Sequence, residues 1–208
     1  MVALQCTLLG SEEPRVDGSV PFERIDLGAG SWIDVARGWL RGADRFLDAL
    51  VDDVDWRCTT RWMYDRMVDD PRLSRWYGRG EEPSHPAFAD IRAALTTRYA
   101  VELGGFGLNY YRDGRDSVAF HRDRELRHID DTLIAITTLG AARPFLVRPL
   151  GGGRSRDLRP ASGDLLVMGG RCQAAFEHAV PKAAHAGPRI SATLRWARNH
   201  GSSGALLV

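Results

Sequence analysis

The hydrophobic residues of this chain follow a helical period in its first half. Residues 44–54 place five apolar side chains on one helical face. Residues 85–99 repeat the pattern, with Ser84 expected as the N-cap and Pro86 in the first turn. We therefore expect a helix over each of these two ranges.

The second half of the chain changes to short apolar runs separated by glycine, proline, aspartate and arginine. Runs of this kind are typical of β-strands joined by turns. They cover residues 106–111, 131–139, 144–150, 163–169, 174–180 and 189–196. Helices followed by at least six strands predict an α+β fold, mainly β, whose sandwich or jelly-roll core carries the chemistry.

Length and composition set limits on the class of protein. A chain of 208 residues fits one domain, and 44% hydrophobic residues support a core. No run of about 18 apolar residues occurs, so we expect no membrane span. The N-terminus has neither the basic region nor the apolar length of a signal peptide. Three cysteines without CxxC spacing argue against a disulfide partner or a zinc site, and favour a reducing cytoplasm.

Charge is distributed unevenly along the chain. Residues 1–56 contain eleven acidic and five basic residues, whereas residues 57–208 contain sixteen acidic and twenty-three basic ones. A basic region of this size is compatible with a polyanionic substrate. Since Lys182 is the only lysine, a biased coding composition is an alternative explanation for the excess of arginine.

Two histidines and one aspartate form a candidate metal site. His121 and Asp123 are two residues apart, so in a strand they would project to the same face. His178 lies in an apolar segment and is expected to point inward. Two imidazoles and one carboxylate are the ligand set of non-haem Fe(II) oxygenases. The alternatives are a surface His–Asp pair and a buried histidine that is hydrogen-bonded in the core.

The segment from Arg189 to Arg195 strengthens the metal interpretation. A strand period puts Arg189, Ser191, Thr193 and Arg195 on one face and apolar residues on the other. Two inward guanidinium groups are costly to bury without anions. A dianionic ligand together with a protein carboxylate would satisfy both. Asn109 and Tyr111 form another pair on one strand face that could bind the same ligand.

Four motifs in order resemble the AlkB family of Fe(II)/2-oxoglutarate-dependent dioxygenases, most closely its DNA-repair branch. They are NYYRDGRDSVAFHRDRE, TTLG, GDLLVMGGRCQAAFEHAVPK and PRISATLR. The resemblance covers residues 105–196 well and the N-terminal half loosely. It implies a single domain over residues 1–208, with N-terminal helices and a nucleotide-recognition lid in 1–104 and a double-stranded β-helix core in 105–200.

The resemblance also implies roles for individual residues. His121, Asp123 and His178 match the Fe(2+) ligands, and Arg189 matches the arginine that binds the distal carboxylate of 2-oxoglutarate. The remaining cosubstrate contacts match Asn109, Tyr111 and Arg195, with Thr193 in the same pocket. Glu125 falls at the acidic position that helps to recognise the damaged base.

The segment MVDDPRLSRWYG resembles the substrate-recognition stretch of the same branch. Arg72 would contact the phosphate backbone, and Met63 and Tyr64 would probe the flipped base. Candidates for stacking on that base are Trp62, Trp76 and Tyr77. The chain departs from the branch after Tyr77, because it lacks the aromatic pair that holds the base and carries Glu81 and Glu82 instead. Packing beneath a lid is the alternative role for the aromatic residues.

The implied function is oxidative demethylation of N-alkylated bases in DNA, or in RNA, with Fe(2+), 2-oxoglutarate and O2. The expected products are formaldehyde, succinate and CO2, and the expected partner of this monomeric protein is methylated DNA or RNA. The first alternative is a 2-oxoglutarate-dependent dioxygenase that acts on RNA, protein or a small metabolite. The second is a catalytically inactive module that binds nucleic acid.

Overall fold

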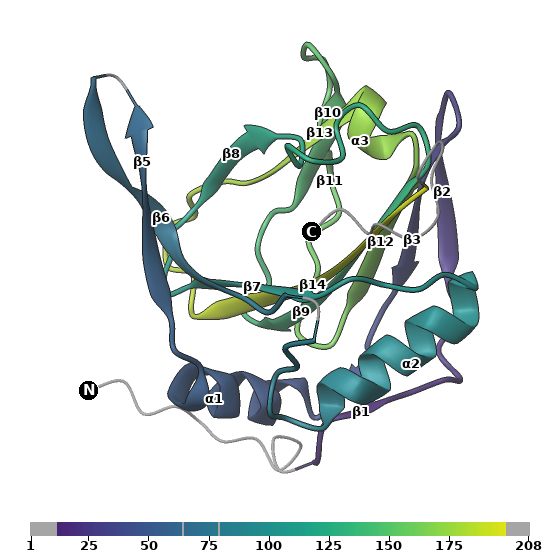
Figure 1. Cartoon of the computed structure of the whole chain (residues 1–208), viewed down its shortest axis with the longest axis vertical. Helices are drawn as coiled ribbons and strands as arrows, with labels where there is room; N and C mark the ends of the chain where they lie inside the picture. The colour runs from purple at the N-terminus through teal and green to yellow at the C-terminus, as the bar shows by residue number, and fades with distance from the viewer. Residues whose placement is uncertain (1–11, 64, 79, 199–208) are drawn as a thin grey trace.

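The computed structural model describes residues 12–63, 65–78 and 80–198, which form two β-sheets packed face to face (Figure 1). The larger sheet has eight strands and the smaller has four. Every strand pair in both sheets is antiparallel. This arrangement confirms the mainly β jelly-roll core that the sequence predicts.

The large sheet is assembled from distant parts of the chain. In order across the sheet, its strands are β2 (Glu23–Gly28), β3 (Ser31–Ala36), β12 (Leu165–Gly170), β9 (Thr132–Gly140), β14 (Arg189–Ala197), β7 (Phe106–Tyr111), β6 (Arg66–Trp76) and β5 (Arg57–Met63). The central position of β14 places its inward side chains in the middle of the molecule.

The small sheet contributes the second wall of the site. Its strands, in order, are β11 (Arg156–Asp157), β10 (Leu146–Pro149), β13 (Phe176–Val180) and β8 (Val118–His121). A separate pair joins β1 (Arg15–Val16) to β4 (Leu40–Arg41). His178 and His121 are direct cross-strand partners in the small sheet, so the ladder itself brings the two imidazoles together.

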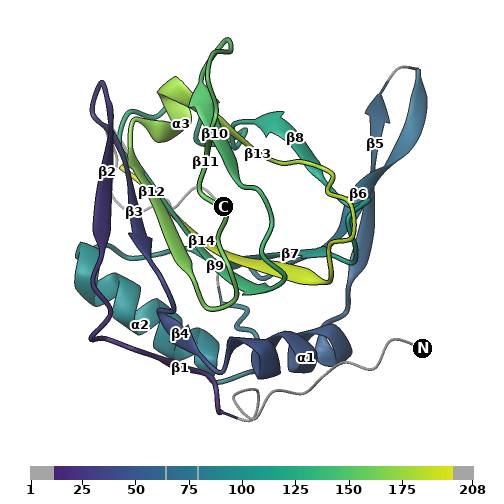
Figure 2. The same ribbon diagram turned by 180° about the vertical axis from the view of Figure 1, so that it is seen from behind.

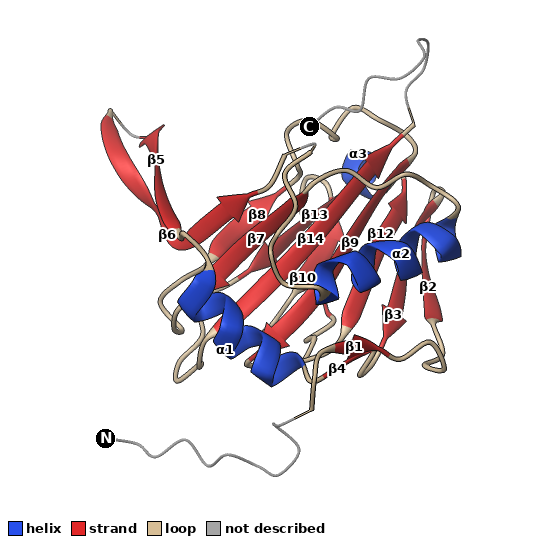
Figure 3. Cartoon of the chain, turned by 60° about the horizontal axis from the view of Figure 1, so that its bottom comes forward, coloured by secondary structure: helices blue, strands red, loops and turns tan. Residues whose placement is uncertain are grey.

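Helices cover the outer face of the large sheet (Figure 3). They are α1 (Ala43–Asp53) and α2 (Ala87–Tyr99), while the short α3 (Cys172–Ala175) connects β12 to β13. Strand β9 shows how both faces of the sheet are buried. Leu133, Ala135 and Leu139 pack in the cluster beneath the helices, and Ile134 and Ile136 pack between the sheets. A strand buried on both faces reads as a continuous apolar run.

Three details of the sequence interpretation are wrong. The helices do not come first, because β1, β2, β3 and β4 precede α1. The residues 57–80, for which no strand was predicted, contain all of β5 and β6. Helix α2 is capped by Pro86 and not by Ser84, and the backbone N–H of Ala87 donates to Nδ1 of His85.

The β5–β6 hairpin extends beyond the body of the two sheets (Figures 1 and 2). Only β6 pairs with the rest of the sheet, through β7. Met67, near the far end of the hairpin, is 57% exposed. Among the described residues, no helix is long and apolar enough to cross a membrane.

We predict that Phe88→Ala lowers the free energy of unfolding by about 3–5 kcal/mol, because Phe88 is fully buried and joins both helices to the sheet. The centroid of its ring lies 5.0 Å from the ring centroid of Phe46 on α1 and 4.7 Å from that of Phe106 on β7. Chemical denaturation measures the change. Thr97→Ala on the exposed side of α2 is the control, and an equal loss in both variants would contradict the packing described.

Candidate active site

His121, Asp123 and His178 converge at one end of the space between the sheets. One ligand atom from each lies within 4.8 Å of the others. Oδ1 of Asp123 is 3.7 Å from Nε2 of His121 and 4.0 Å from Nε2 of His178. Their spacing is that of groups that could share one metal ion.

Asp123 does not reach this position through the strand period that the sequence suggested. Strand β8 ends at His121, and Asp123 lies in the following turn. Its backbone N–H donates to Oε1 of Gln173 (2.8 Å), and its Oδ2 accepts from Nε of Arg195 (2.6 Å). The aspartate is therefore placed by hydrogen bonds to two other segments of the chain.

The ionisation of Asp123 and His178 suits metal binding. Burial alone would raise the pKa of Asp123, but the Arg195 guanidinium and the nearby imidazoles outweigh it and lower the pKa. Burial, aided by His121, lowers the pKa of His178 to about 3, so this imidazole is neutral. Nδ1 of His121 lies 2.9 Å from the carbonyl oxygen of Ala119, which can only accept, so Nε2 is the ring nitrogen that faces Asp123 and is placed to bind a metal.

An ionised carboxylate and two neutral imidazoles are the forms in which these side chains bind metals. Two imidazoles and one carboxylate would leave further coordination positions of a bound ion for other ligands. This donor set fits Fe(II) in the facial-triad arrangement.

A pocket of about 450 Å³, including its open mouth, adjoins the triad. Its apolar wall comes from the inter-sheet cluster. The residues that line it are Arg72, Asn109, Tyr111, Val118, His121, Asp123, Ile134, Ile136, Phe145, His178, Val180, Ser191, Thr193 and Arg195. Most of the predicted cosubstrate residues therefore surround one cavity.

The inward row of β14 is confirmed. Ser191, Thr193 and Arg195 line the pocket, while Ile190 and Ala192 pack beneath the helices. Arg189 is buried on the same strand but is not among the residues that line the pocket. Oγ1 of Thr193 donates to the carbonyl of Gly107 and accepts from Nη1 of Arg195.

Arg189 is fully buried and has no acidic partner among the described residues. Its Nη2 donates to Oγ1 of Thr138 (3.3 Å), and its Nε and Nη1 have no hydrogen-bond partner in the described part of the chain. Burial lowers the pKa of Arg189 to about 10, which leaves it charged at neutral pH. A buried cation with two free donors is suited to bind a carboxylate.

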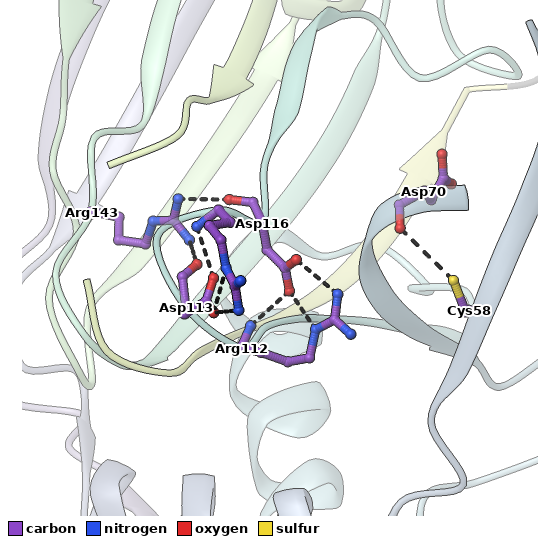
Figure 4. A network of polar contacts seen from close by, with 7 residues as sticks. Cys58, Asp70, Arg112, Asp113, Asp116 and Arg143 are labelled. Atoms are coloured by element: carbon purple, nitrogen blue, oxygen red, sulfur yellow. Dashed lines mark hydrogen bonds and ion pairs between the residues drawn. The ribbon is translucent and has the colours of Figure 1, made fainter. Parts of the chain in front are cut away.

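A second buried arginine, Arg143, fixes the turn between β7 and β8. Its guanidinium donates to the carbonyls of Asp113, Asp116 and Pro181 at 2.8–2.9 Å. Asp116 in turn accepts from the side chain and backbone of Arg112 (Figure 4). Sequence reasoning missed Arg143 and Gln173. Arg143 belongs to no periodic pattern or quoted motif, and Gln173 lies within the motif that contains His178 but at a position to which the resemblance assigns no role.

The substrate residues predicted from the sequence are spread over different environments. Arg72 lines the pocket and donates to Oδ1 of Asn109 (2.8 Å). The ring of Trp76 lies 5.4 Å from Cζ of Arg195, beside Gly107, where a Cβ would come within 3.0 Å of both side chains. Tyr77 packs instead beneath the helices.

Glu125 is the remaining substrate candidate whose side chain the structure describes. It is exposed in the turn after Asp123 and does not line the pocket. Trp62 and Met63 fall at the end of β5, and Tyr64 lies outside the described residues.

Comparison with known proteins links this geometry to one family. A sequence profile of the 2OG-Fe(II) oxygenase superfamily matches residues 83–196. The human protein named alpha-ketoglutarate-dependent dioxygenase alkB homolog 3 is 30% identical over 177 residues, which cover 75% of this chain and 62% of the human protein. The chain thus spans less than two thirds of the length of that relative.

Two further similarities extend over more of the chain. DNA oxidative demethylase ALKBH2 from Arabidopsis thaliana is 26% identical and aligns with 91% of this chain and 74% of its own length. A prolyl hydroxylase from Trichoplax adhaerens superposes with a TM-score of 0.59 at 12% identity, over 79% of this chain and 83% of that one. The structural match concerns the fold alone.

We predict that Arg195→Met destabilises the metal-free protein more at about pH 7 than at about pH 4. Without the guanidinium, burial raises the pKa of Asp123, so the variant must either bury an unpaired carboxylate or take up a proton at neutral pH. At about pH 4 the Asp123 carboxyl of the variant is already protonated, so the difference in stability between the variant and the unaltered protein becomes smaller. The expected loss at neutral pH is about 3 kcal/mol.

Thermal unfolding of chelator-treated protein across this pH range measures the effect. Arg198→Met is the control, since Arg198 forms an exposed pair with Asp131 close to the end of the same strand. A loss of stability that is the same at both pH values would contradict the assigned ionisation of Asp123.

Proposed function

Because this chain belongs to the 2OG-Fe(II) oxygenase superfamily, and to the AlkB homologues within it, we propose that it demethylates N-alkylated bases in DNA or RNA. Fe(II), 2-oxoglutarate and O2 are the cofactor and cosubstrates that family membership brings. The proposal rests on one observation above all: Arg189 is fully buried, has two donors without a partner among the described residues, and packs against Tyr111, which lines the same pocket as the His–Asp–His cluster.

The chain's own residues would hold each part of the reacting assembly. His121, Asp123 and His178 would bind Fe(II). The free Nε and Nη1 of Arg189 would receive the distal carboxylate of 2-oxoglutarate.

Three other pocket side chains would contact the same cosubstrate, namely Asn109, Tyr111 and Thr193. Arg195 would add charge while it fixes Asp123. The Tyr111 ring lies 5.6 Å from Cζ of Arg189, so it shields this cation from water and supports its orientation.

Bound Fe(II) with 2-oxoglutarate and O2 supplies the oxidising chemistry, in which the cosubstrate becomes succinate and CO2 and an N-methyl group is hydroxylated. The N-hydroxymethyl product releases formaldehyde when its C–N bond breaks: the electron pair of that bond returns to the ring nitrogen, the hydroxyl oxygen becomes the carbonyl oxygen of formaldehyde, and the hydroxyl proton leaves to solvent. The protein contributes orientation and a dry apolar wall that includes Phe145 and Ile136.

On the substrate side, Arg72 and Trp76 are the best placed of the predicted residues. Arg72 lies at the pocket wall, and Trp76 lies on the same face of β6, next to Arg195. A base must leave its stack to reach such a pocket, and Trp76 offers an aromatic surface at its edge. Roles for Trp62, Met63, Tyr64, Tyr77 and Glu125, the monomeric state and the cytoplasmic location stay predictions.

We predict that the protein releases formaldehyde from oligonucleotides that carry 1-methyladenine or 3-methylcytosine, in the presence of iron and 2-oxoglutarate. A panel of single- and double-stranded DNA and RNA with matched unmodified strands would identify the preferred polymer. Asp123→Ala should abolish release, because a metal ligand is lost. Turnover of 2-oxoglutarate that no methylated nucleic acid stimulates would contradict the proposed substrate.

We also predict that Arg189→Met keeps or raises the thermal stability of the ligand-free protein, yet loses the stabilisation that 2-oxoglutarate gives. An apolar side chain of similar volume avoids burying an unpaired cation, whereas the bound carboxylate loses charge-assisted hydrogen bonds of about 1.5–3 kcal/mol each. Thermal shift with the metal and increasing 2-oxoglutarate measures both effects.

Arg115→Met, at an exposed arginine paired with Asp113, is the control for this substitution. If Arg189→Met bound 2-oxoglutarate as tightly as the unaltered protein, Arg189 could not be the carboxylate site.

A further inference from the structure

The short helix α3 carries a buried glutamine next to the candidate metal centre. Gln173 is 0% exposed. Its Oε1 accepts the backbone N–H of Asp123, whereas its Nε2 is buried without a partner among the residues that the structure describes. A buried carboxamide is costly unless it is hydrogen-bonded, so the single bond to Asp123 is the contact that accounts for its place here.

The backbone around Asp123 has no ladder to hold it. The two histidines are aligned because β8 and β13 pair at His121 and His178, but β8 has ended before Asp123. The carbonyl of Asp123 accepts from the N–H groups of Leu126 and Arg127, which only closes its own turn. Its N–H is the backbone group that connects this turn to another segment.

That other segment leads directly to the third ligand. Gln173 lies five residues before His178, and α3 runs into β13 without an intervening loop. Figure 1 shows α3 beside the start of β13, at the end of the small sheet. A second bond supports the same junction, since Nη1 of Arg122 donates to the carbonyl of Ala174 (3.3 Å).

With the N–H held by Gln173 and Oδ2 held by Arg195, Oδ1 is the part of Asp123 that faces both histidines. We propose that Gln173 is a positioning residue for the metal centre, which fixes the backbone of Asp123 relative to the segment that carries His178. The inference rests on the proposed metal-ligand role of Asp123. It assigns Gln173 no contact with metal or substrate.

The test compares metal affinity with folding stability in two variants that remove the bond. Gln173→Met keeps the length of the side chain without its acceptor, and Gln173→Asn keeps the carboxamide but shortens its reach. Titration with Co(II) alone, followed by its visible absorption, gives the affinity and reports the ligand geometry. Thermal unfolding of the metal-free protein gives the stability of each variant.

Cys172→Ala is the matched control, because Cys172 is equally buried in the same helical turn but donates to the carbonyl of Trp32, away from the metal centre. Loss of a contact that orients a metal ligand typically costs about 10–100-fold in affinity. Both glutamine variants should weaken Co(II) binding by about tenfold or more relative to Cys172→Ala and alter the Co(II) spectrum, at similar metal-free stability.

Co(II) binding that is less than about fivefold weaker than in Cys172→Ala would overturn the role of Gln173. If Gln173→Met does not fold, Gln173→Asn decides the outcome by the same threshold. Asp123→Ala separates this failure from that of the metal site itself. If Asp123→Ala binds Co(II) normally, the proposed ligand set is wrong. If Asp123→Ala loses Co(II) binding while both Gln173 variants keep it, the ligand set stands and only the role of Gln173 is wrong.

Discussion

The ion pair between Arg195 and Asp123 joins the two sheets at the point where the chemistry is expected. Arg195 belongs to β14 of the large sheet, and Asp123 follows β8 of the small one. A carboxylate this deep in a protein remains ionised only when a cation compensates for its lost hydration. The pair therefore keeps Asp123 in the form that binds a metal, and it also limits how far the two sheets can separate.

The same central strand explains why the pocket can be charged and stable together. One face of β14 contributes Ile190, Ala192 and Leu194 to the cluster under the helices, and the other face presents Ser191, Thr193 and Arg195 to the cavity. Burial on the helix side anchors the strand. Burying Arg189 without an acidic partner among the described residues costs free energy of folding. The apolar packing on the outer face of the same strand offsets this cost.

Much of this arrangement could be predicted from sequence where a period of two was strict. The alternation along residues 189–195 predicted which side chains of β14 point between the sheets. The apolar runs predicted β7, β9 and β12. The early strands β2 and β3 escaped detection because their residues are mixed in polarity, and Asp34 is even buried in a polar cluster with Arg24 and Tyr99. The places of Asp123, Gln173 and Arg143 depend on hydrogen bonds between distant segments, which no local pattern encodes.

The contacts of Arg143 carry a consequence for variation among related sequences. Its hydrogen bonds within the described residues go to backbone carbonyls, those of Asp113, Asp116 and Pro181. Because every residue type offers the same carbonyl, the clamp does not depend on the side chains of Asp113 and Pro181. Gly114 and Asp116 are constrained for other reasons, since a Cβ at Gly114 would clash with the carbonyl oxygen of Ala183 and the Asp116 carboxylate holds Arg112. The exposed side chain of Arg115 can therefore change while the strands on either side of the turn keep their register.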